Sequence, residues 1–378
     1  MPAYQQMGHD SKNLLDVADL TAYAGAIVSP VNYTEEATRA QIERLQTANF
    51  DFIFDPQLYY PQTNRGVLRE WPHFPADVDT ADQSSLPWWE ALINRVVETG
   101  TGLGAHSICS PAIVPRSYTN DYYDMLTQVG SLLAKTSGGC TPVQTLPVPL
   151  SDLADRDRAF AIASILSRTE CRRVYLIFIT DLEPRRELAD AAELTGGMIL
   201  ISLLEQSGLR VLVGFSSSDI VLWKAAGATA CATGKFFNLR RFTKSRFEEP
   251  AGGGGQLPYW VEESLFAYLR ETDVIRVRGE NLISDASTRN PFSQPIFNAI
   301  ERGEPWLALS WRHYMWWFAD FEQRMTRGDA DPRSLLQQAE NNWLALQDRD
   351  VLFEEPRNNG SWVRPWRQAL ADFRKLST

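Results

Sequence analysis

The sequence has few of the residues that hold metal ions in clusters. Its 378 residues include four cysteines, Cys109, Cys140, Cys171 and Cys231, and four histidines. The cysteines form no Cys-x-x-Cys pair, and the histidines show no His-x-His or His-Glu-x-x-His spacing. We therefore expect neither structural zinc nor a histidine-based metal site. Most of the cysteines lie in or beside strand-like segments, so we interpret them as small core residues in a reducing compartment.

Long hydrophobic runs and an excess of positive charge are also missing. No apolar run reaches the ~20 residues that span a bilayer, and the N-terminal MPAYQQMGHDSKNLL has no apolar signal-peptide core. We therefore expect a soluble, cytoplasmic protein with no membrane partner. The net charge of −10 argues against non-specific coating of nucleic acid, so any contact with a polyanion must be local.

From residue 24 to residue 234 the sequence alternates short apolar runs with amphipathic segments. The apolar runs are 25–28, 52–54, 102–105, 142–146, 174–179, 211–213 and 230–232. The helical segments between them are 35–47, 88–98, 122–134, 152–166, 186–206 and 219–226. This alternation predicts an α/β fold with a parallel sheet buried on both faces. We predict a (β/α)₈, TIM-like barrel whose eighth strand either precedes Ala24 or lies at 198–203. The alternative is an open doubly wound sheet, although no Gly-x-Gly-x-x-Gly turn follows any strand.

The composition changes after the barrel segment. Four consecutive glycines, 252–255, separate an expected barrel at 1–250 from a mainly helical C-terminal domain or extension at 256–378. Helices are expected at 260–270, 297–302, 306–327, 334–347 and 362–375, with one strand at 274–277. Seven of the twelve tryptophans lie after residue 305, so these helices are expected either to form a buried core or to contact a protein partner.

Three polar residues follow apolar runs and are candidate catalytic groups. Asp55 ends FDFIFD, Asp181 ends LIFITD, and His106 ends GLGAH. In (β/α)₈ barrels, catalytic groups lie at the carboxyl ends of strands. The two carboxylates could act as acid, base or nucleophile, or could bind Mg²⁺. The structural alternatives are an Asp-Pro turn at Asp55, a helix cap at Asp181 and a purely structural His106.

The last two apolar runs end in glycine and hydroxyl residues, a combination that suits phosphate binding. The predicted phosphate ligands are Gly214, Ser216, Ser217, Thr233, Gly234 and Lys235. These loops resemble those of the broad group of phosphate-binding barrels, which hold a phosphate after their last two strands. Phe215 replaces a glycine that is common in that group. The alternatives are ordinary loops with a serine helix cap, and a Schiff-base role for Lys235.

A strip of alternating cations and aromatics follows at once. KFFNLRRFTKSRF, residues 235–247, contains five cations and four phenylalanines. Cations bind backbone phosphates and aromatic faces stack on bases, so Arg240, Arg241, Lys244 and Arg246 are predicted nucleic-acid contacts. The alternative is a connecting segment with buried phenylalanines and solvated cations.

The segment FIFDPQLYYP, residues 52–61, is similar to the acidic strand end of tRNA-guanine-transglycosylase-like barrels. The zinc cysteines of that family have no counterpart here. The resemblance implies glycosyl transfer or base exchange on a nucleotide or nucleic acid, with Asp55 or Asp181 as nucleophile or base. The expected function is thus a barrel that binds a phosphorylated or polyanionic ligand. The alternatives are a non-catalytic subunit that binds nucleic acid or protein, and a metal- or flavin-dependent barrel.

Overall fold

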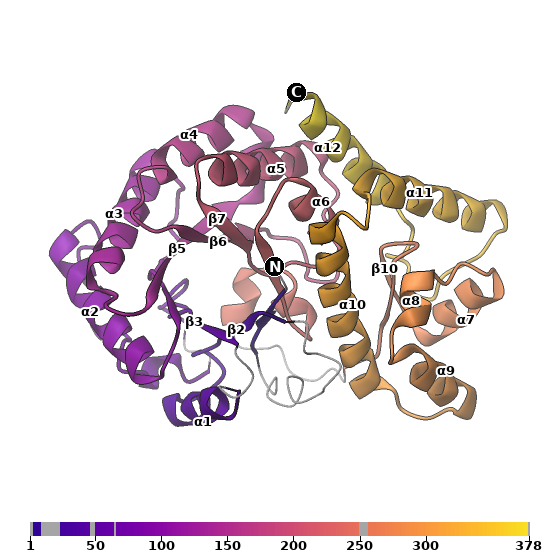
Figure 1. The fold of residues 1–378 in the computed structure, drawn as a ribbon, viewed down its shortest axis with the longest axis horizontal. Helices are drawn as coiled ribbons and strands as arrows, with labels where there is room; N and C mark the ends of the chain where they lie inside the picture. The colour runs from indigo at the N-terminus through magenta and orange to yellow at the C-terminus, as the bar shows by residue number, and fades with distance from the viewer. Residues whose placement is uncertain (1–2, 9–22, 46–49, 64–65, 249–255, 377–378) are drawn as a thin grey trace.

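Eight parallel strands close into a barrel in the computed structural model, which describes residues 3–8, 23–45, 50–63, 66–248 and 256–376 (Figure 1). The strands are β1 (Tyr4–Gln6), β2 (Gly25–Val28), β3 (Asp51–Phe54), β4 (Ser107–Cys109), β5 (Thr141–Pro149), β6 (Arg173–Ile179), β7 (Arg210–Val213) and β8 (Ala230–Thr233). β1 pairs with both β2 and β8, and the pairing of Gln5 with Thr233 closes the ring. The predicted TIM-like barrel is confirmed, and the open sheet is excluded.

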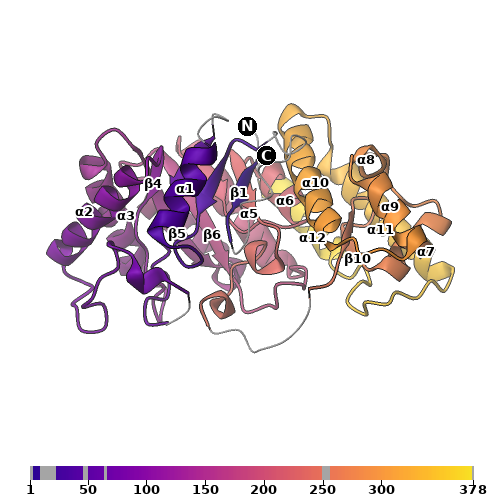
Figure 2. The same cartoon turned by 90° about the horizontal axis from the view of Figure 1, so that it is seen from below.

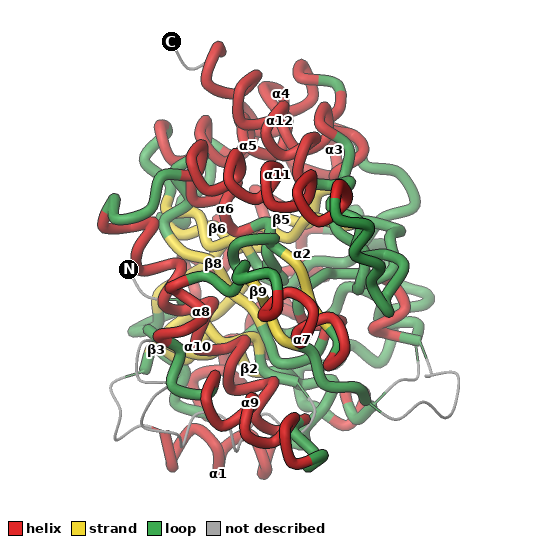
Figure 3. Tube along the Cα trace, turned by 90° about the vertical axis from the view of Figure 1, so that its right-hand side faces the viewer, coloured by secondary structure: helices red, strands yellow, loops and turns green. Residues whose placement is uncertain are grey.

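Six helices in the described part of the chain surround the barrel, and three of them begin with a side-chain cap. They are α1 (Glu35–Leu45), α2 (Leu86–Gly102), α3 (Asn120–Thr136), α4 (Arg156–Leu166), α5 (Ala191–Gln206) and α6 (Ile220–Ala225). Thr119, Asp155 and Asp190 each accept a hydrogen bond from a backbone N–H of the first turn of α3, α4 and α5. In Figure 3 the yellow strands lie inside a layer of red helices.

Two of the strands differ from those that the sequence predicts. The eighth strand is β1, which precedes Ala24, whereas residues 198–203 lie inside α5. Residues 102–105 are not a strand: they end α2 and turn at Gly104, whose φ of +78° is readily adopted only by glycine. The strand that follows α2 is instead β4. Residues 102–106, which the sequence places in a strand and at its carboxyl end, therefore precede the strand and lie at the amino end of the barrel.

The C-terminal region begins with a β-hairpin and continues as helices. The hairpin pairs β9 (Trp260–Glu262) with β10 (Ala267–Leu269), so the helix expected at 260–270 is wrong. Glu262 accepts hydrogen bonds from the backbone N–H groups of Ser264 and Ser284, which fixes the turn. The helices are α7 (Glu271–Gly279), α8 (Asp285–Arg289), α9 (Ser293–Arg302), α10 (Leu307–Arg327), α11 (Pro332–Asp348) and α12 (Val363–Leu376). The strand expected at 274–277 lies inside α7.

The C-terminal helices lie beside the barrel and pack against its last units (Figure 2). α10 packs on α6 and β8, and α12 packs on α5. A buried ion pair joins α6 to α10, with Lys224 Nζ 2.9 Å from Glu322 Oε1. Five of the seven C-terminal tryptophans are buried: Trp306, Trp317, Trp343, Trp362 and Trp366. These tryptophans form the core of this region.

Candidate functional site

The central opening of the barrel is closed at its C-terminal face by an aromatic plug of Tyr59, Phe215, Phe242 and Phe247. Residues 236–248 cross the opening after β8, and Phe242 forms an isolated parallel bridge with Ile179 at the end of β6. The Phe242 ring is fully buried, with its centroid 5.1 Å from those of both Tyr59 and Phe215. A ligand therefore cannot enter along the barrel axis.

The same crossing segment buries three of its arginines. Arg240 donates to the carbonyl oxygens of Gly234 and Lys235, and its guanidinium lies 3.3 Å from the Tyr314 ring centroid. Arg246 donates to Ser29 Oγ. Arg241, with a side chain only 4% exposed, lies within ion-pair distance of Glu187 and Asp219.

Of the four predicted nucleic-acid contacts, only Lys244 is strongly exposed, with 64% of its side chain accessible. The expected basic outer surface is therefore corrected: the strip turns inward, because Phe242 and Phe247 fill the barrel opening and the arginines beside them are buried as well.

The predicted phosphate cradle after β7 and β8 is filled by protein side chains. Thr233 Oγ1 donates to the carbonyl oxygen of Ser216 and lies 2.6 Å from the Tyr314 hydroxyl. Ser217 Oγ lies 2.8 Å from the Tyr268 hydroxyl, and Ser216 Oγ donates to the Val213 carbonyl. All three hydroxyl residues are at most 2% exposed. The cradle expected at these atoms is therefore already occupied.

Protein side chains also fill the space beside the two glycines of the cradle, Gly214 and Gly234. A Cβ on Gly214 would lie 2.5 Å from the Tyr175 ring, and one on Gly234 would lie 2.5 Å from the Leu239 side chain. Among the six predicted phosphate ligands, Lys235 lines a cavity of about 330 Å³, and Gly214 lines only a small void of about 20 Å³. The Lys235 ammonium is 4.4 Å from the Trp311 ring centroid.

The three candidate catalytic residues do not meet. Asp55 is buried near the plug, accepts hydrogen bonds from the Tyr59 hydroxyl and the Gln57 N–H, and has its pKa raised to about 6 by burial. His106 precedes β4 and accepts a hydrogen bond from the backbone N–H of Phe52, early in β3. The sequence predicts His106 on the C-terminal rim. This prediction is wrong, because a residue that precedes β4 lies at the N-terminal end of the barrel. Only Asp181 lines a cavity.

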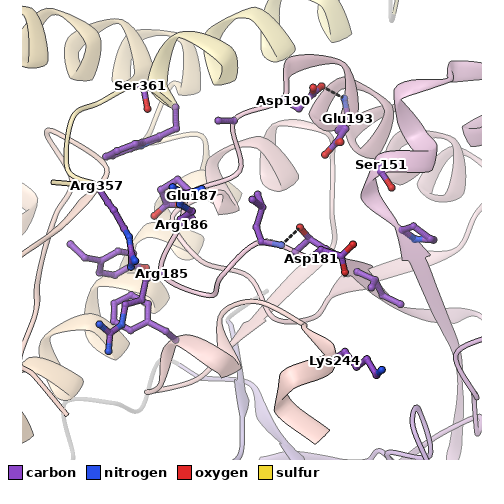
Figure 4. A pocket seen from close by; sticks show the side chains of 18 of the residues that line it. Ser151, Asp181, Arg185, Arg186, Glu187, Asp190, Glu193, Lys244, Arg357 and Ser361 are labelled. Atoms are coloured by element: carbon purple, nitrogen blue, oxygen red, sulfur yellow. Dashed lines mark hydrogen bonds between the residues drawn. The ribbon is translucent and has the colours of Figure 1, made fainter. Parts of the chain in front are cut away.

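The main cavity has a volume of about 1460 Å³ and lies off the barrel axis. Figure 4 shows side chains that line it. Its walls come from the loops after β3, β4, β5 and β6, from the crossing segment, and from the C-terminal hairpin and the loop before α12. The lining cations are Arg116, Arg185, Arg186, Lys244 and Arg357; the carboxylates are Asp181, Glu187, Asp190, Glu193, Glu248 and Glu355; the aromatics are Tyr60, Tyr118, Phe237, Tyr259, Tyr268 and Trp362. This mixed lining suits a ligand with an aromatic part and several polar groups.

A smaller cavity of about 330 Å³ adjoins the main one. Arg185, Phe237 and Tyr259 line both cavities, and the Arg185 guanidinium lies 5.8 Å from the centroid of each ring. Its charged lining differs from that of the main cavity: Arg185, Lys235, Arg240 and Arg246 contribute four cations, and none of the described lining residues is a carboxylate. The electrostatic preference of the smaller cavity is therefore for an anion.

Glu187 is one of the cavity residues that the sequence did not single out. Its side chain is 7% exposed and accepts a 2.7 Å hydrogen bond from Ser218 Oγ. Burial raises its pKa to about 7, although Arg241 acts in the opposite direction. The sequence pattern predicts a helix from residue 186, whereas α5 begins at Ala191 and Glu187 precedes it. The Asp190-x-x-Glu193 pattern was the available signal, because it marks a helix start at 191 and leaves Glu187 in a loop.

Neither a metal cluster nor a membrane span is found in the part of the chain that the structure describes. No three histidine, cysteine, aspartate or glutamate side chains there gather as a metal site, and no helix there is long and apolar enough to cross a bilayer. Three of the four cysteines are buried and none is disulfide-bonded, which agrees with their expected role in the core.

The sequence matches no protein-family profile and no curated protein. Among solved structures, it is similar to the aldolase QR15, with 12% identity, a TM-score of 0.37, and coverage of 62% of this chain and 89% of that one. The citrate synthase SbnG gives 11% identity and a TM-score of 0.35, covering 62% and 86% of the two chains. The enoyl reductase domain of MlnA from Bacillus amyloliquefaciens gives 11% identity and a TM-score of 0.30, covering 99% and 95%. Likeness at this level identifies neither a family nor an activity.

Proposed function

We propose that the protein binds a nucleotide, alone or as part of a single strand, across the two adjoining cavities. The observation that carries this proposal is their difference in charge. The smaller cavity is lined by four cations with no carboxylate among its described lining residues, whereas the larger one combines both charges with six aromatic side chains. A phosphate would lie toward the smaller cavity, and the base and sugar would lie in the larger one.

The junction between the cavities supports this orientation. Arg185 faces the Phe237 and Tyr259 rings there, so a guanidinium for phosphate and aromatic faces for a base lie together. Stacking of a base on an aromatic side chain contributes about 1–3 kcal/mol, and it tolerates different bases. Because the main cavity exceeds the ~300–1,000 Å³ of ordinary small-molecule sites, it leaves room for more than one nucleotide.

Glycosyl transfer through Asp55 and Asp181 has less support. Asp55 is buried near the plug and lines neither cavity, so one of the two carboxylates lacks access to a ligand there. The proposal is therefore a binding function, with Asp181 available to hydrogen-bond the sugar or base.

The proposal predicts that phosphate increases affinity through Arg185. Isothermal titration calorimetry at low salt would compare adenosine, AMP and the phosphodiester-linked thymidine dinucleotide. Arg185→Ala should weaken AMP binding by about 10–100-fold, because a charge-assisted hydrogen bond contributes about 1.5–3 kcal/mol. Binding of adenosine should change much less.

Arg172→Ala is the matched control, because Arg172 is exposed and immediately precedes β6 at the opposite end of the barrel. It should leave all three affinities unchanged. Equal affinity for adenosine and AMP, or no binding of any of the three compounds, would contradict the proposed function.

A further inference from the structure

Two adjacent asparagines in the loop before α12 differ in how their side chains are held. Both Asn358 and Asn359 line the main cavity. Asn358 Nδ2 donates a 2.6 Å hydrogen bond to the carbonyl oxygen of Tyr268 in β10. Asn359 is exposed, and its Nδ2 has no hydrogen-bond partner among the residues that the structure describes. The side-chain amide of Asn359 is therefore the less restrained of the two.

Gly360 follows Asn359 and leaves its own backbone nitrogen accessible. The chain contains a single Asn-Gly pair, and it lies here. Gly360 has a φ of +72° and packs on Trp343, where a Cβ would lie 2.4 Å from the ring, so the position requires glycine. Its N–H donates no hydrogen bond within the described part of the chain. Asn359 Oδ1 accepts from the Ser361 N–H at 3.0 Å, which closes a ring of atoms that includes both the Asn359 amide carbon and the Gly360 nitrogen.

We propose that Asn359 is a site of spontaneous deamidation, which adds a negative charge to the wall of the main cavity. The Gly360 nitrogen loses its proton and attacks Asn359 Cγ. The new N–Cγ bond forms, the Cγ–Nδ2 bond breaks, and Nδ2 leaves with that proton as ammonia. Water then opens the cyclic imide at either carbonyl and gives aspartate or isoaspartate. Water is the only co-reactant, and the inference does not rest on the proposed function.

Asn358 lacks the features that favour this reaction at Asn359. An amide nitrogen is a poor nucleophile until it loses its proton, because its lone pair is delocalised into the carbonyl. The nitrogen that would attack Asn358 belongs to Asn359, and its N–H is held by the Arg357 carbonyl oxygen at 3.1 Å. The Asn358 side chain is itself fixed on Tyr268. Two asparagines of one loop are therefore expected to age differently.

The product would alter the cavity wall in two ways. The new carboxylate stands on the same wall as Arg357 and lowers the positive potential there. In isoaspartate the main chain runs through the side-chain carbons, which lengthens the backbone before Gly360. Gly360 packs on Trp343, whose ring centroid lies 5.6 Å from that of Trp362, a lining residue of the main cavity. A shift of the turn is therefore passed to an aromatic side chain of the cavity.

Peptide mapping by mass spectrometry tests the proposal on the full-length protein, incubated at pH 6 and at pH 8. The peptide that contains Asn359 should become about 1 Da heavier, with fragment ions that place the change at this residue and a second chromatographic peak for isoaspartate. The modified fraction should grow faster at pH 8, because the attacking nitrogen must lose a proton. Asn358, in the same peptide, should keep its mass.

Two variants and one denatured sample serve as controls. Asn359→Gln keeps a side-chain amide but requires a larger ring for the attack, so the peptide should keep its mass. Asn358→Gln should leave the reaction at Asn359 unchanged. Protein unfolded in urea gives the rate of the unrestrained chain. Folded protein that stays unmodified while the unfolded protein gains mass at Asn359 would overturn the proposal, and so would a mass gain at Asn358 instead. These outcomes do not involve a ligand, so they leave the proposed function to its own test.

Discussion

Tyr175 occupies the middle of the barrel and restricts the residues around it. Its hydroxyl donates to Gln6 Oε1 at 2.8 Å, and its ring lies against the backbone of Gly214 at the end of β7. The sequence suggested that Gly214 was small so that a phosphate could approach the backbone. In the structure the neighbour is a tyrosine ring instead, so the glycine is required for packing.

Gly214→Ala should destabilise the protein. Its Cβ would lie 2.5 Å from the Tyr175 ring, which is fully buried, so the free energy of unfolding should fall by about 1–3 kcal/mol. Gly102→Ala is the control, because nothing lies within 4 Å of that Cβ at the end of α2. It should be neutral or stabilising by up to about 1 kcal/mol. Urea unfolding followed by circular dichroism measures both, and equal effects would refute this explanation of Gly214.

At the scale of elements, the C-terminal region completes the barrel rim. Tyr268 from β10 and Tyr314 from α10 place their hydroxyls on Ser217 and Thr233, the residues that follow or end β7 and β8. In many (β/α)₈ barrels, a ligand phosphate occupies this place. Here two tyrosines satisfy the same hydroxyls, which moves the available binding space outward to the side cavities.

Tyr314→Phe tests this contact. Removing the hydroxyl deletes a buried hydrogen bond to Thr233, so the free energy of unfolding should fall by about 0.5–1.5 kcal/mol. Tyr118→Phe is a matched control, because the buried Tyr118 hydroxyl has no hydrogen-bond partner among the described residues. That change should be neutral or slightly stabilising in the same chemical denaturation experiment. A larger loss for Tyr118→Phe than for Tyr314→Phe would contradict the assignment.

The fold was more predictable from the sequence than the site. The long apolar strands β5 and β6 and their following helices show local periodicity, so alternation alone identifies the barrel. β1 was not located, because its sequence YQQ carries no apolar run and is held in place by pairing with β2 and β8. The residues of 260–269 fit a helix locally, whereas the hairpin turn depends in part on the contact of Glu262 with Ser284, a distant residue.

Within the site, strand-end position identified Asp181 as a cavity residue but gave the wrong end of the barrel for His106. The error arises because the sequence predicts the strand at 102–105, whereas the strand is β4, which begins after His106. The residues of the crossing segment do not show whether its side chains face solvent or the barrel opening. Alternating cations and phenylalanines fit an outer surface and a plug equally well. Only the packing at the carboxyl end of the barrel, where Phe242 meets Tyr59 and Phe215, decides between them.

At the scale of the whole molecule, one buried ion pair joins the barrel to the helices beside it. Lys224 donates to Glu322 Oε1 and also to the carbonyl oxygens of Ala228 and Thr229, and the Glu322 side chain is fully buried. Breaking such a pair leaves an uncompensated charge, which typically costs about 3–5 kcal/mol.

Glu322→Gln should therefore lower the free energy of unfolding by about 3 kcal/mol or more. Glu301→Gln, which breaks the exposed pair with Arg278, should change it by at most about 1 kcal/mol. Because the buried pair links the two regions, Glu322→Gln should also separate their unfolding, seen as a broadened or two-step calorimetric transition. A single sharp transition at the wild-type temperature would show that the pair contributes little.

The contact between Thr233 and Tyr314 also has a consequence for how the chain is made. The two residues are 81 positions apart, so at about 5–20 residues per second the ribosome releases the tyrosine about 4–16 seconds after the eighth strand. During that interval β7 and β8 can pair, but the hydroxyls of Ser217 and Thr233 have not yet met their tyrosine partners. The nascent barrel therefore acquires its final rim only when α10 has emerged, and the main cavity is completed only after the loop before α12, residues 355–362, has followed.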